Sequence, residues 1–158
     1  MLEAFLEIIS VLEQSKIPYC IIGGIAVLIY GGRTSTLDLD FYFVAKSRKR
    51  LVISLEALGA TLCARGEFQY QGSFRGFRFD VLVADRWIGL PALKRAKKVK
   101  FGDITLRVAT PEDLIVMKTI ADRPIDRRDT QELRELFREL DEPYINKRLT
   151  VTRTAMEQ

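Results

Sequence analysis

Two aspartates separated by a single residue are the feature of this sequence that most directly indicates chemistry. Asp38 and Asp40 lie in the run TLDLDFYF, residues 36–43, where apolar side chains occupy every second position. This period of two predicts a strand over 37–44, with the apolar side chains on one face and both carboxylates on the other. Same-face neighbours lie about 6.5 to 7 Å apart at Cα. The two carboxylates can therefore converge on one divalent cation, which would also offset their mutual repulsion.

A glycine pair precedes the aspartates. The apolar stretch 17–22 predicts a strand that ends at Gly23 and Gly24, and a short helix is expected over 25–30. Glycine at such a turn lets an anion approach the backbone N–H groups closely, as phosphates do at helix starts. The same pair would also suit a simple tight turn, so the glycines alone leave both interpretations open.

A third aspartate stands on a later strand. The segment 74–84 alternates again and carries Asp80 on its less apolar face. If the two aspartate-bearing strands are neighbours, three carboxylates meet beside the glycine turn. An ion pair of Asp80 with Arg75 or Arg78 is the structural alternative.

The composition limits the chemistry that these carboxylates can support. The chain has 158 residues, 47% of them hydrophobic, which fits one globular α/β domain over 1–158 with a buried core. It contains no histidine, so Ser-His-Asp and Cys-His catalysis and the usual zinc sites are excluded. The reaction must therefore use carboxylates, lysine, arginine, hydroxyls and hard metal ions.

The cellular setting follows from what the sequence lacks. No apolar run has the length of a membrane span, and the acidic start of the chain does not resemble a signal peptide. Cys20 and Cys63 both lie in apolar surroundings and are expected to be buried thiols, not a disulfide, which is typical of a cytoplasmic protein. Basic residues cluster over 46–50 and 94–100. They suit a phosphate-bearing partner or an ordinary solvated surface.

The remaining pattern indicates alternating helices and strands. Helices are predicted over 2–15, 47–58, 110–122 and 127–140; strand-like segments over 61–71 and 74–84; and a hairpin over 98–108 turned at Gly102-Asp103. The core is expected over about 17–110, with C-terminal helices over about 111–140. The tail 141–158 is polar and is expected to be partly loose.

The ordered set of these motifs resembles the polymerase-β-like nucleotidyltransferase superfamily. The matching residues are the glycine pair, the run from Arg33 through Thr36 to the two aspartates, and the later lone acid. The closest likeness is to small bacterial members, including the AbiEii-type toxins of toxin–antitoxin pairs. The run PEDLIVMK, residues 111–118, followed by Arg123, Asp126 and Asp129, is similar to that group. The likeness spans about residues 17 to 130.

The resemblance implies a mixed sheet flanked by helices and a metal-dependent nucleotidyl transfer. Asp38, Asp40 and Asp80 would bind Mg²⁺ or Mn²⁺, and Asp80 would help to deprotonate the acceptor. The nucleotide triphosphate would contact Gly23, Gly24, Arg33 and Lys118. The acceptor hydroxyl could belong to RNA, a protein or a small molecule, and a toxin would have an antitoxin partner. The relatives often carry a serine where Gly24 stands and a lysine where Ile125 stands.

Other functions suit the same residues. The fold could bind nucleotide or a partner protein without turnover, or the basic residues 94–100 could bind RNA in an accessory domain. Lys118 borders the apolar side of its helix and could extend its ammonium to solvent. Asp126 also suits a helix cap, with Asp129 in the first turn.

Overall fold

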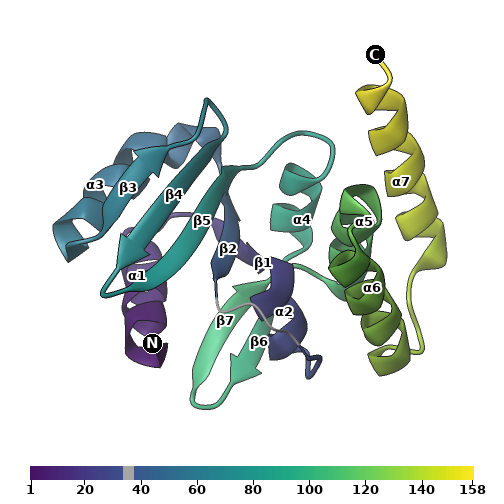
Figure 1. The fold of residues 1–158 in the computed structure, drawn as a ribbon, viewed down its shortest axis with the longest axis horizontal. Coiled ribbons are helices and arrows are strands. Elements are labelled where there is room, and N and C mark those ends of the chain that lie inside the picture. The colour runs from purple at the N-terminus through teal and green to yellow at the C-terminus, as the bar shows by residue number, and fades with distance from the viewer. Residues whose placement is uncertain (34–37) are drawn as a thin grey trace.

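A mixed sheet runs through the molecule in the order β3-β4-β5-β2-β1-β7-β6 (Figure 1). The structure is a computed structural model, and it describes residues 1–33 and 38–158. Thr36 and Leu37, which the sequence places in the approach to the aspartate strand, lie outside the described residues. The strands are β1 Tyr19–Ile22, β2 Leu39–Phe43, β3 Thr61–Ala64, β4 Gln69–Phe74, β5 Phe77–Val83, β6 Lys97–Phe101 and β7 Ile104–Val108.

Helices cover the sheet and extend beyond it. α1 and α3 lie behind the β3–β4–β5 end of the sheet, while α5, α6 and α7 stand side by side at the other end of the view (Figure 1). The helices are α1 Leu2–Gln14, α2 Gly23–Ile29, α3 Arg48–Leu58, α4 Gly89–Arg95, α5 Pro111–Ala121, α6 Pro124–Leu136 and α7 Glu142–Met156. This arrangement confirms the α/β fold expected from the sequence, a mixed sheet flanked by helices with further helices at the C-terminal end. None of the described helices is both long enough and apolar enough to span a bilayer.

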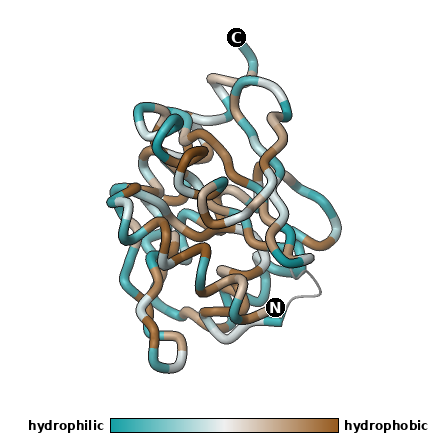
Figure 2. The backbone as a smooth tube through the Cα atoms, turned by 90° about the vertical axis from the view of Figure 1, so that its left-hand side faces the viewer, coloured by the Kyte–Doolittle hydropathy of each residue, from teal (hydrophilic) through white to brown (hydrophobic). Residues whose placement is uncertain are grey.

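The core lies where the alternating strands meet α1 and α3. Leu39, Phe41 and Phe43 are fully buried, as the period of two in β2 predicted. The ring of Phe41 stacks on Phe79 of β5 and meets Tyr19 of β1 edge to face. Figure 2 shows hydrophobic segments running through the interior, with hydrophilic ones mostly at the loops and the C-terminal end. Packing on one face of β2 thus fixes the carboxylates on the other.

Three parts of the fold before residue 141 differ from the prediction. The segment 61–71 is divided into β3 and the start of β4, and a helix that was not predicted, α4, ends at the start of the basic stretch before the hairpin. The helix expected over 127–140 begins at Pro124, because proline suits the first helical position and Asp126 accepts the Arg123 N–H at 3.2 Å.

The tail that was expected to be partly loose is helix α7. Asp141 caps its start by accepting the Tyr144 N–H at 3.0 Å. Packing holds it on the rest of the fold: Ile145 is fully buried, and the Tyr144 hydroxyl donates to Asp113 of α5. The prediction was wrong because these contacts, which join positions far apart in sequence, stabilise a segment whose own sequence is polar.

Candidate active site

Asp40 and Asp80 lie directly side by side. β2 pairs with β5 in parallel, and the register places Asp40 opposite Asp80. Opposed residues on adjacent strands point to the same face, and neighbouring strands are about 4.8 Å apart. The sequence predicted that these aspartates meet if their strands are neighbours, and β2 and β5 are neighbours.

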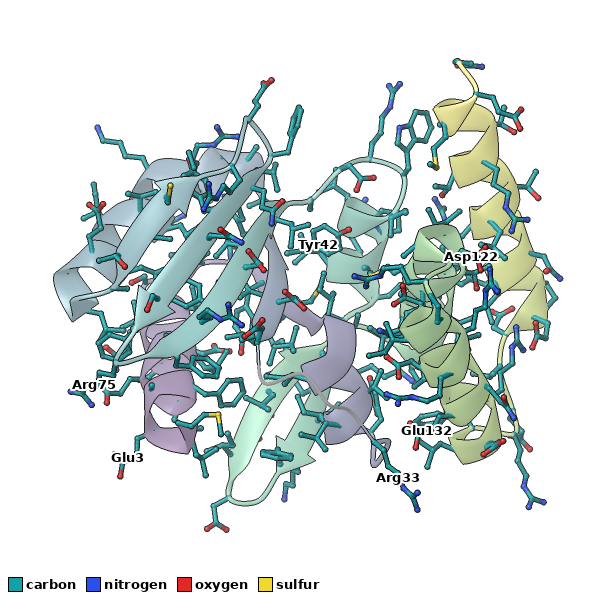
Figure 3. All side chains as sticks on the ribbon, viewed as in Figure 1. Glu3, Arg33, Tyr42, Arg75, Asp122 and Glu132 are labelled. Carbon is teal, nitrogen blue, oxygen red and sulfur yellow. The ribbon has the colours of Figure 1, made fainter. Side chains whose placement is uncertain are left out.

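Asp38 stands just before β2 at the same end of the sheet. Its carboxylate accepts a hydrogen bond from Arg78 of β5 at 3.4 Å. Arg75 instead pairs with Glu7 of α1, and Figure 3 shows its side chain at the outer edge of the fold. In the described part of the chain neither arginine forms the ion pair with Asp80 that was the alternative to a functional role.

Gly23 brings the backbone against the Asp40 carboxylate. β1 runs antiparallel to β2 and pairs Ile22 with Asp40, so the next residue, Gly23, borders that side chain. Gly23 has φ +70°, and a Cβ built there would lie 2.3 Å from Asp40 Oδ2. Both the backbone angle and the space exclude a side chain. Gly24 follows as a buried residue in the first turn of α2.

Burial and neighbouring acids make Asp40 hard to ionise. Burial is the largest effect, and the negative charges of Asp80 and Asp38 add to it, so that the pKa of Asp40 rises from 3.8 to about 7. Lys118 and Arg123 act in the opposite direction. A buried carboxylate whose pKa is raised by neighbouring acids is typical of functional sites.

Lys118 belongs to a buried charge cluster on the helices that face these carboxylates. Its ammonium lies 2.7 Å from Asp129 Oδ2 and 3.3 Å from Asp126 Oδ1. The side chains of the two acids are each 1% exposed and that of Lys118 is 8% exposed. An ammonium has three N–H donors, so the two carboxylates leave one for a further acceptor. Lys118 is held in the interior instead of extending to solvent.

Arg123 closes the outer side of this cluster. Its guanidinium donates to Asp126 Oδ2 at 2.6 Å and to Oδ1 at 3.1 Å. Burial alone would raise the pKa of Asp126, but the Arg123 hydrogen bond and the Lys118 charge outweigh it and lower the pKa. Asp126 therefore stays ionised, caps α6 and orients two cations. Asp129 Oδ1, by contrast, is buried without a hydrogen-bond partner.

These residues line one pocket of about 260 Å³, here called the carboxylate pocket. Its lining includes all three sequence-predicted aspartates, both glycines, Lys118, Asp126 and Asp129, together with Arg123 and Ile125. Arg33 is absent from this lining, and Figure 3 shows its side chain pointing away from the sheet. An adjoining cavity of about 320 Å³ shares Asp40 and Lys118 and adds the apolar side chains of Leu82, Leu114 and Met117.

Gln69 is a site residue that the sequence did not suggest. Its amide donates to Asp80 Oδ1 at 3.2 Å from the neighbouring strand β4. The contact depends on the antiparallel register of β4 and β5, which no local pattern around Gln69 reveals. The sequence identified Arg123 only as part of a motif. In the structure its salt bridge with Asp126 holds it in the lining of the carboxylate pocket.

The carboxylates fit a hard divalent cation. Carboxylate oxygens are the ligands that Mg²⁺ and Mn²⁺ prefer, and a cation beside Asp40 would remove the cost of its ionisation. Within residues 1–33 and 38–158, however, no three acidic or thiol side chains already form a compact ligand cluster. Asp38 is turned toward Arg78, so completing a three-carboxylate set would require that side chain to rotate.

Solved structures with the same fold include antibiotic-modifying enzymes. The crystal structure of ANT(2'')-Ia in complex with adenylyl-2''-tobramycin superposes with a TM-score of 0.70 at 16% identity, covering 99% of each chain. The lincosamide antibiotic adenylyltransferase LnuA, bound to lincomycin, gives 0.66 at 15% identity, covering 85% of this chain and 97% of LnuA. At these identities the likeness shows the fold. No curated protein matches the sequence.

A family profile, described as "Nucleotidyltransferase of unknown function (DUF6036)", matches residues 1–158. It therefore covers every residue of the carboxylate pocket. The chain belongs to this nucleotidyltransferase family.

Proposed function

We propose that this protein is a metal-dependent nucleotidyltransferase that moves a nucleoside monophosphate from a nucleoside triphosphate to a hydroxyl group. The observation that carries the proposal is the pairing of Asp40 with Asp80 on adjacent parallel strands beside Gly23. Family membership supports the reaction class.

Asp38, Asp40 and Asp80 would hold the metal ion. A bound Mg²⁺ or Mn²⁺ would supply Lewis-acid charge and a template for the phosphates. The high pKa of Asp40 follows from burial and from two neighbouring acids, and this supports a site whose charge balance requires a cation. The absence of histidine is consistent with such chemistry.

The surrounding side chains have distinct roles in this proposal. Lys118 presents its remaining N–H, and Arg123 its exposed edge, to the triphosphate. Gly23 and Gly24 leave room for a phosphate near the backbone. The cavity lined by Leu82, Leu114 and Met117 offers an apolar surface to the base. Asp80 accepts the proton of the acceptor hydroxyl, and pyrophosphate leaves.

The AbiEii-like motif supports a narrower second proposal, a toxin with an antitoxin partner. Its Lys118, Asp126 and Asp129 are assembled into one cluster at the pocket. Growth arrest on expression of the protein, relieved by a small protein encoded next to it, would support that role. Growth arrest that persists in the Asp80→Asn variant would contradict a toxin that acts by nucleotidyl transfer.

Equilibrium binding and transfer can be measured separately. Isothermal titration calorimetry of the protein with each NTP in the presence of Mg²⁺ should show binding to the wild type. The Asp40→Ala variant should lose this Mg²⁺-dependent binding. Asp80→Asn should retain binding but lose transfer of α-labelled nucleotide to acceptors in a cell extract. Asp103→Asn, at the exposed β6–β7 turn, is the matched control for removal of a carboxylate.

The outcomes separate the two main alternatives. Binding without transfer in the wild type would identify a nucleotide-binding module. Mg²⁺ titrations that are the same for Asp40→Ala and the wild type would refute the metal site.

A further inference from the structure

An outer pocket adjoins the carboxylate pocket at two of the aspartates. This outer pocket of about 310 Å³ lies over β3, β4 and β5 and includes Asp38 and Asp80 in its lining. The carboxylate pocket shares those two residues but extends toward α5 and α6. Because β5 stands between β4 and β2 in the sheet, the two pockets lie to either side of Asp80.

The strand registers turn the floor of the outer pocket into an ordered row of polar side chains. Cys63 of β3 pairs with Gln71 of β4, Gln71 with Asp80 of β5, and Asp80 with Asp40 of β2. Paired residues share a face, and each step along the row is about 4.8 Å. A molecule resting on Gln71 would thus lie next to the Asp80 carboxylate.

A second row runs parallel to the first. Thr61 pairs with Ser73, and Ser73 with Arg78. The buried residues of β5 alternate with these and face the opposite side, where α1 and α3 lie behind the strands (Figure 1). Thr61, Cys63 and Gln71 are exposed, so this face of the three strands is open.

The chemistry of the floor favours a neutral or amine-bearing ligand rich in hydroxyl groups. Hydroxyl and amide side chains offer both donors and acceptors, and the lining holds two acids, Asp38 and Asp80, against one basic residue, Arg78. Arg65, beside the pocket, is hydrogen-bonded to Gln71. The volume is at the lower end of small-molecule sites, about 300 to 1,000 Å³.

A nucleic-acid acceptor would need a different surface. Protein–RNA contacts depend on lysine and arginine directed at phosphates. The basic cluster over 46–50 lies at the start of α3, behind the strands, and the cluster over 94–100 lies on α4 and β6, beyond β1 in the sheet order. Neither cluster belongs to the lining of the outer pocket.

The geometry points to the outer pocket as the acceptor site, with a polyhydroxylated small molecule as its ligand. This inference rests on the proposed nucleotidyl transfer. A hydroxyl oxygen of the ligand forms a bond to the α-phosphorus of the NTP, and the bond from that phosphorus to the pyrophosphate oxygen breaks. The hydroxyl proton passes to Asp80 and then to solvent, and pyrophosphate departs.

Cys63 provides a selective probe of this pocket. The prediction that both cysteines are buried was wrong for Cys63, which is exposed on β3. Cys20 is buried, and burial chiefly raises the pKa of its thiol to about 12. Biotin-maleimide should therefore modify Cys63 alone, because the thiolate is the reactive form. In a Cys63→Ser background, Ala57→Cys places an exposed thiol on α3 as the labelling control.

Two acceptor probes and one RNA probe make the test specific. Tobramycin and lincomycin represent hydroxyl-rich small molecules, and total tRNA represents RNA. Modification of Cys63 should leave the NTP affinity within about twofold and lower label transfer to the small molecules at least about tenfold. Ala57→Cys should be insensitive. Gln71→Leu should raise the KM for the acceptor and leave that for NTP unchanged, with Gln14→Leu on α1 as control.

Each outcome supports or overturns the inference. Protection of Cys63 by a small-molecule probe, together with the loss of transfer after modification, supports it. Unchanged transfer by the modified protein overturns it, as does failure of both small molecules to protect Cys63 while NTP binding is intact. Transfer to tRNA alone overturns it in favour of RNA. If the unmodified protein does not bind NTP, the proposed function itself is overturned.

Discussion

Replacing Lys118 by methionine should strongly destabilise the protein, because it removes the cation between two buried carboxylates. Asp126 and Asp129 are each 1% exposed. Asp126 would keep its hydrogen bonds from Arg123. Asp129 would be poorly compensated, since its Oδ1 has no hydrogen bond and only the exposed Arg128 at 3.7 Å, and its Oδ2 would lose Lys118. Breaking a buried ion pair from one side costs about 3 to 5 kcal/mol.

Urea unfolding at pH 7 measures this cost directly. Thermal unfolding gives a second measure: at roughly 2 to 4 °C of melting temperature per kcal/mol for a chain of this length, the melting temperature should fall by about 10 °C. The double variant Lys118→Met/Asp129→Asn should recover a large part of the loss, because an amide needs no counter-charge.

An exposed ion pair in the same region provides the control. Arg127 and Asp122 are 68% and 61% exposed, so solvent screens their interaction and Arg127→Met should destabilise the protein far less than Lys118→Met. If Lys118→Met costs as little as Arg127→Met, the ammonium is not held by the two carboxylates, and the reasoning about the cluster is wrong.

Three further predictions concern Asp40, Gly23 and helix α7. In EDTA, the free energy of unfolding should fall as pH rises from about 4 to 7, because burial and Asp80 raise the pKa of Asp40 to about 7 in the folded chain and the unfolded chain ionises first. Asp40→Asn should lose most of that slope, and identical urea profiles for the two proteins would contradict this. Gly23→Ala should destabilise the protein more than Gly76→Ala, because both glycines have positive φ but only Gly23 has the Asp40 carboxylate where a Cβ would lie; equal melting temperatures would show that Asp40 moves aside freely. Tyr144→Phe should cost about 1 kcal/mol and speed amide hydrogen exchange in α7, since its hydroxyl donates to Asp113; unchanged exchange would mean that this bond does not hold the helix.

The aspartate strand was predictable because one face of β2 is buried so completely. Leu39, Phe41 and Phe43 leave the alternate positions no choice of face. The β6–β7 hairpin followed from Gly102, which has φ +62° at its turn. The adjacency of β2 and β5 was not predictable from local pattern, because it depends on long-range pairing. The sequence therefore predicted the three-aspartate site only on the condition that these two strands are neighbours.

The placement of Lys118 shows where residue types alone were insufficient. The sequence identified it as a cation for phosphate, and it does line the carboxylate pocket. Two of its contacts are nevertheless to Asp126 and Asp129, from the next helix. The angle between α5 and α6 brings these groups together, and that angle follows from the turn at Asp122, which adopts φ +52°. No periodicity in the sequence specifies it.

The turn between β4 and β5 determines the face of the sheet to which each side chain of β5 points, and with it the position of Asp80. Arg75 and Gly76 both have positive φ, which is typical of the tight two-residue connection that fixes hairpin register. Side chains alternate along a strand, so adding or deleting one residue within β5 would carry Asp80 into the apolar interior. Evolution and protein engineering can therefore lengthen this hairpin in steps of two, or extend it beyond its tip, without moving the carboxylate. Insertion or deletion of an odd number of residues within β5 would inactivate the site without changing the overall fold.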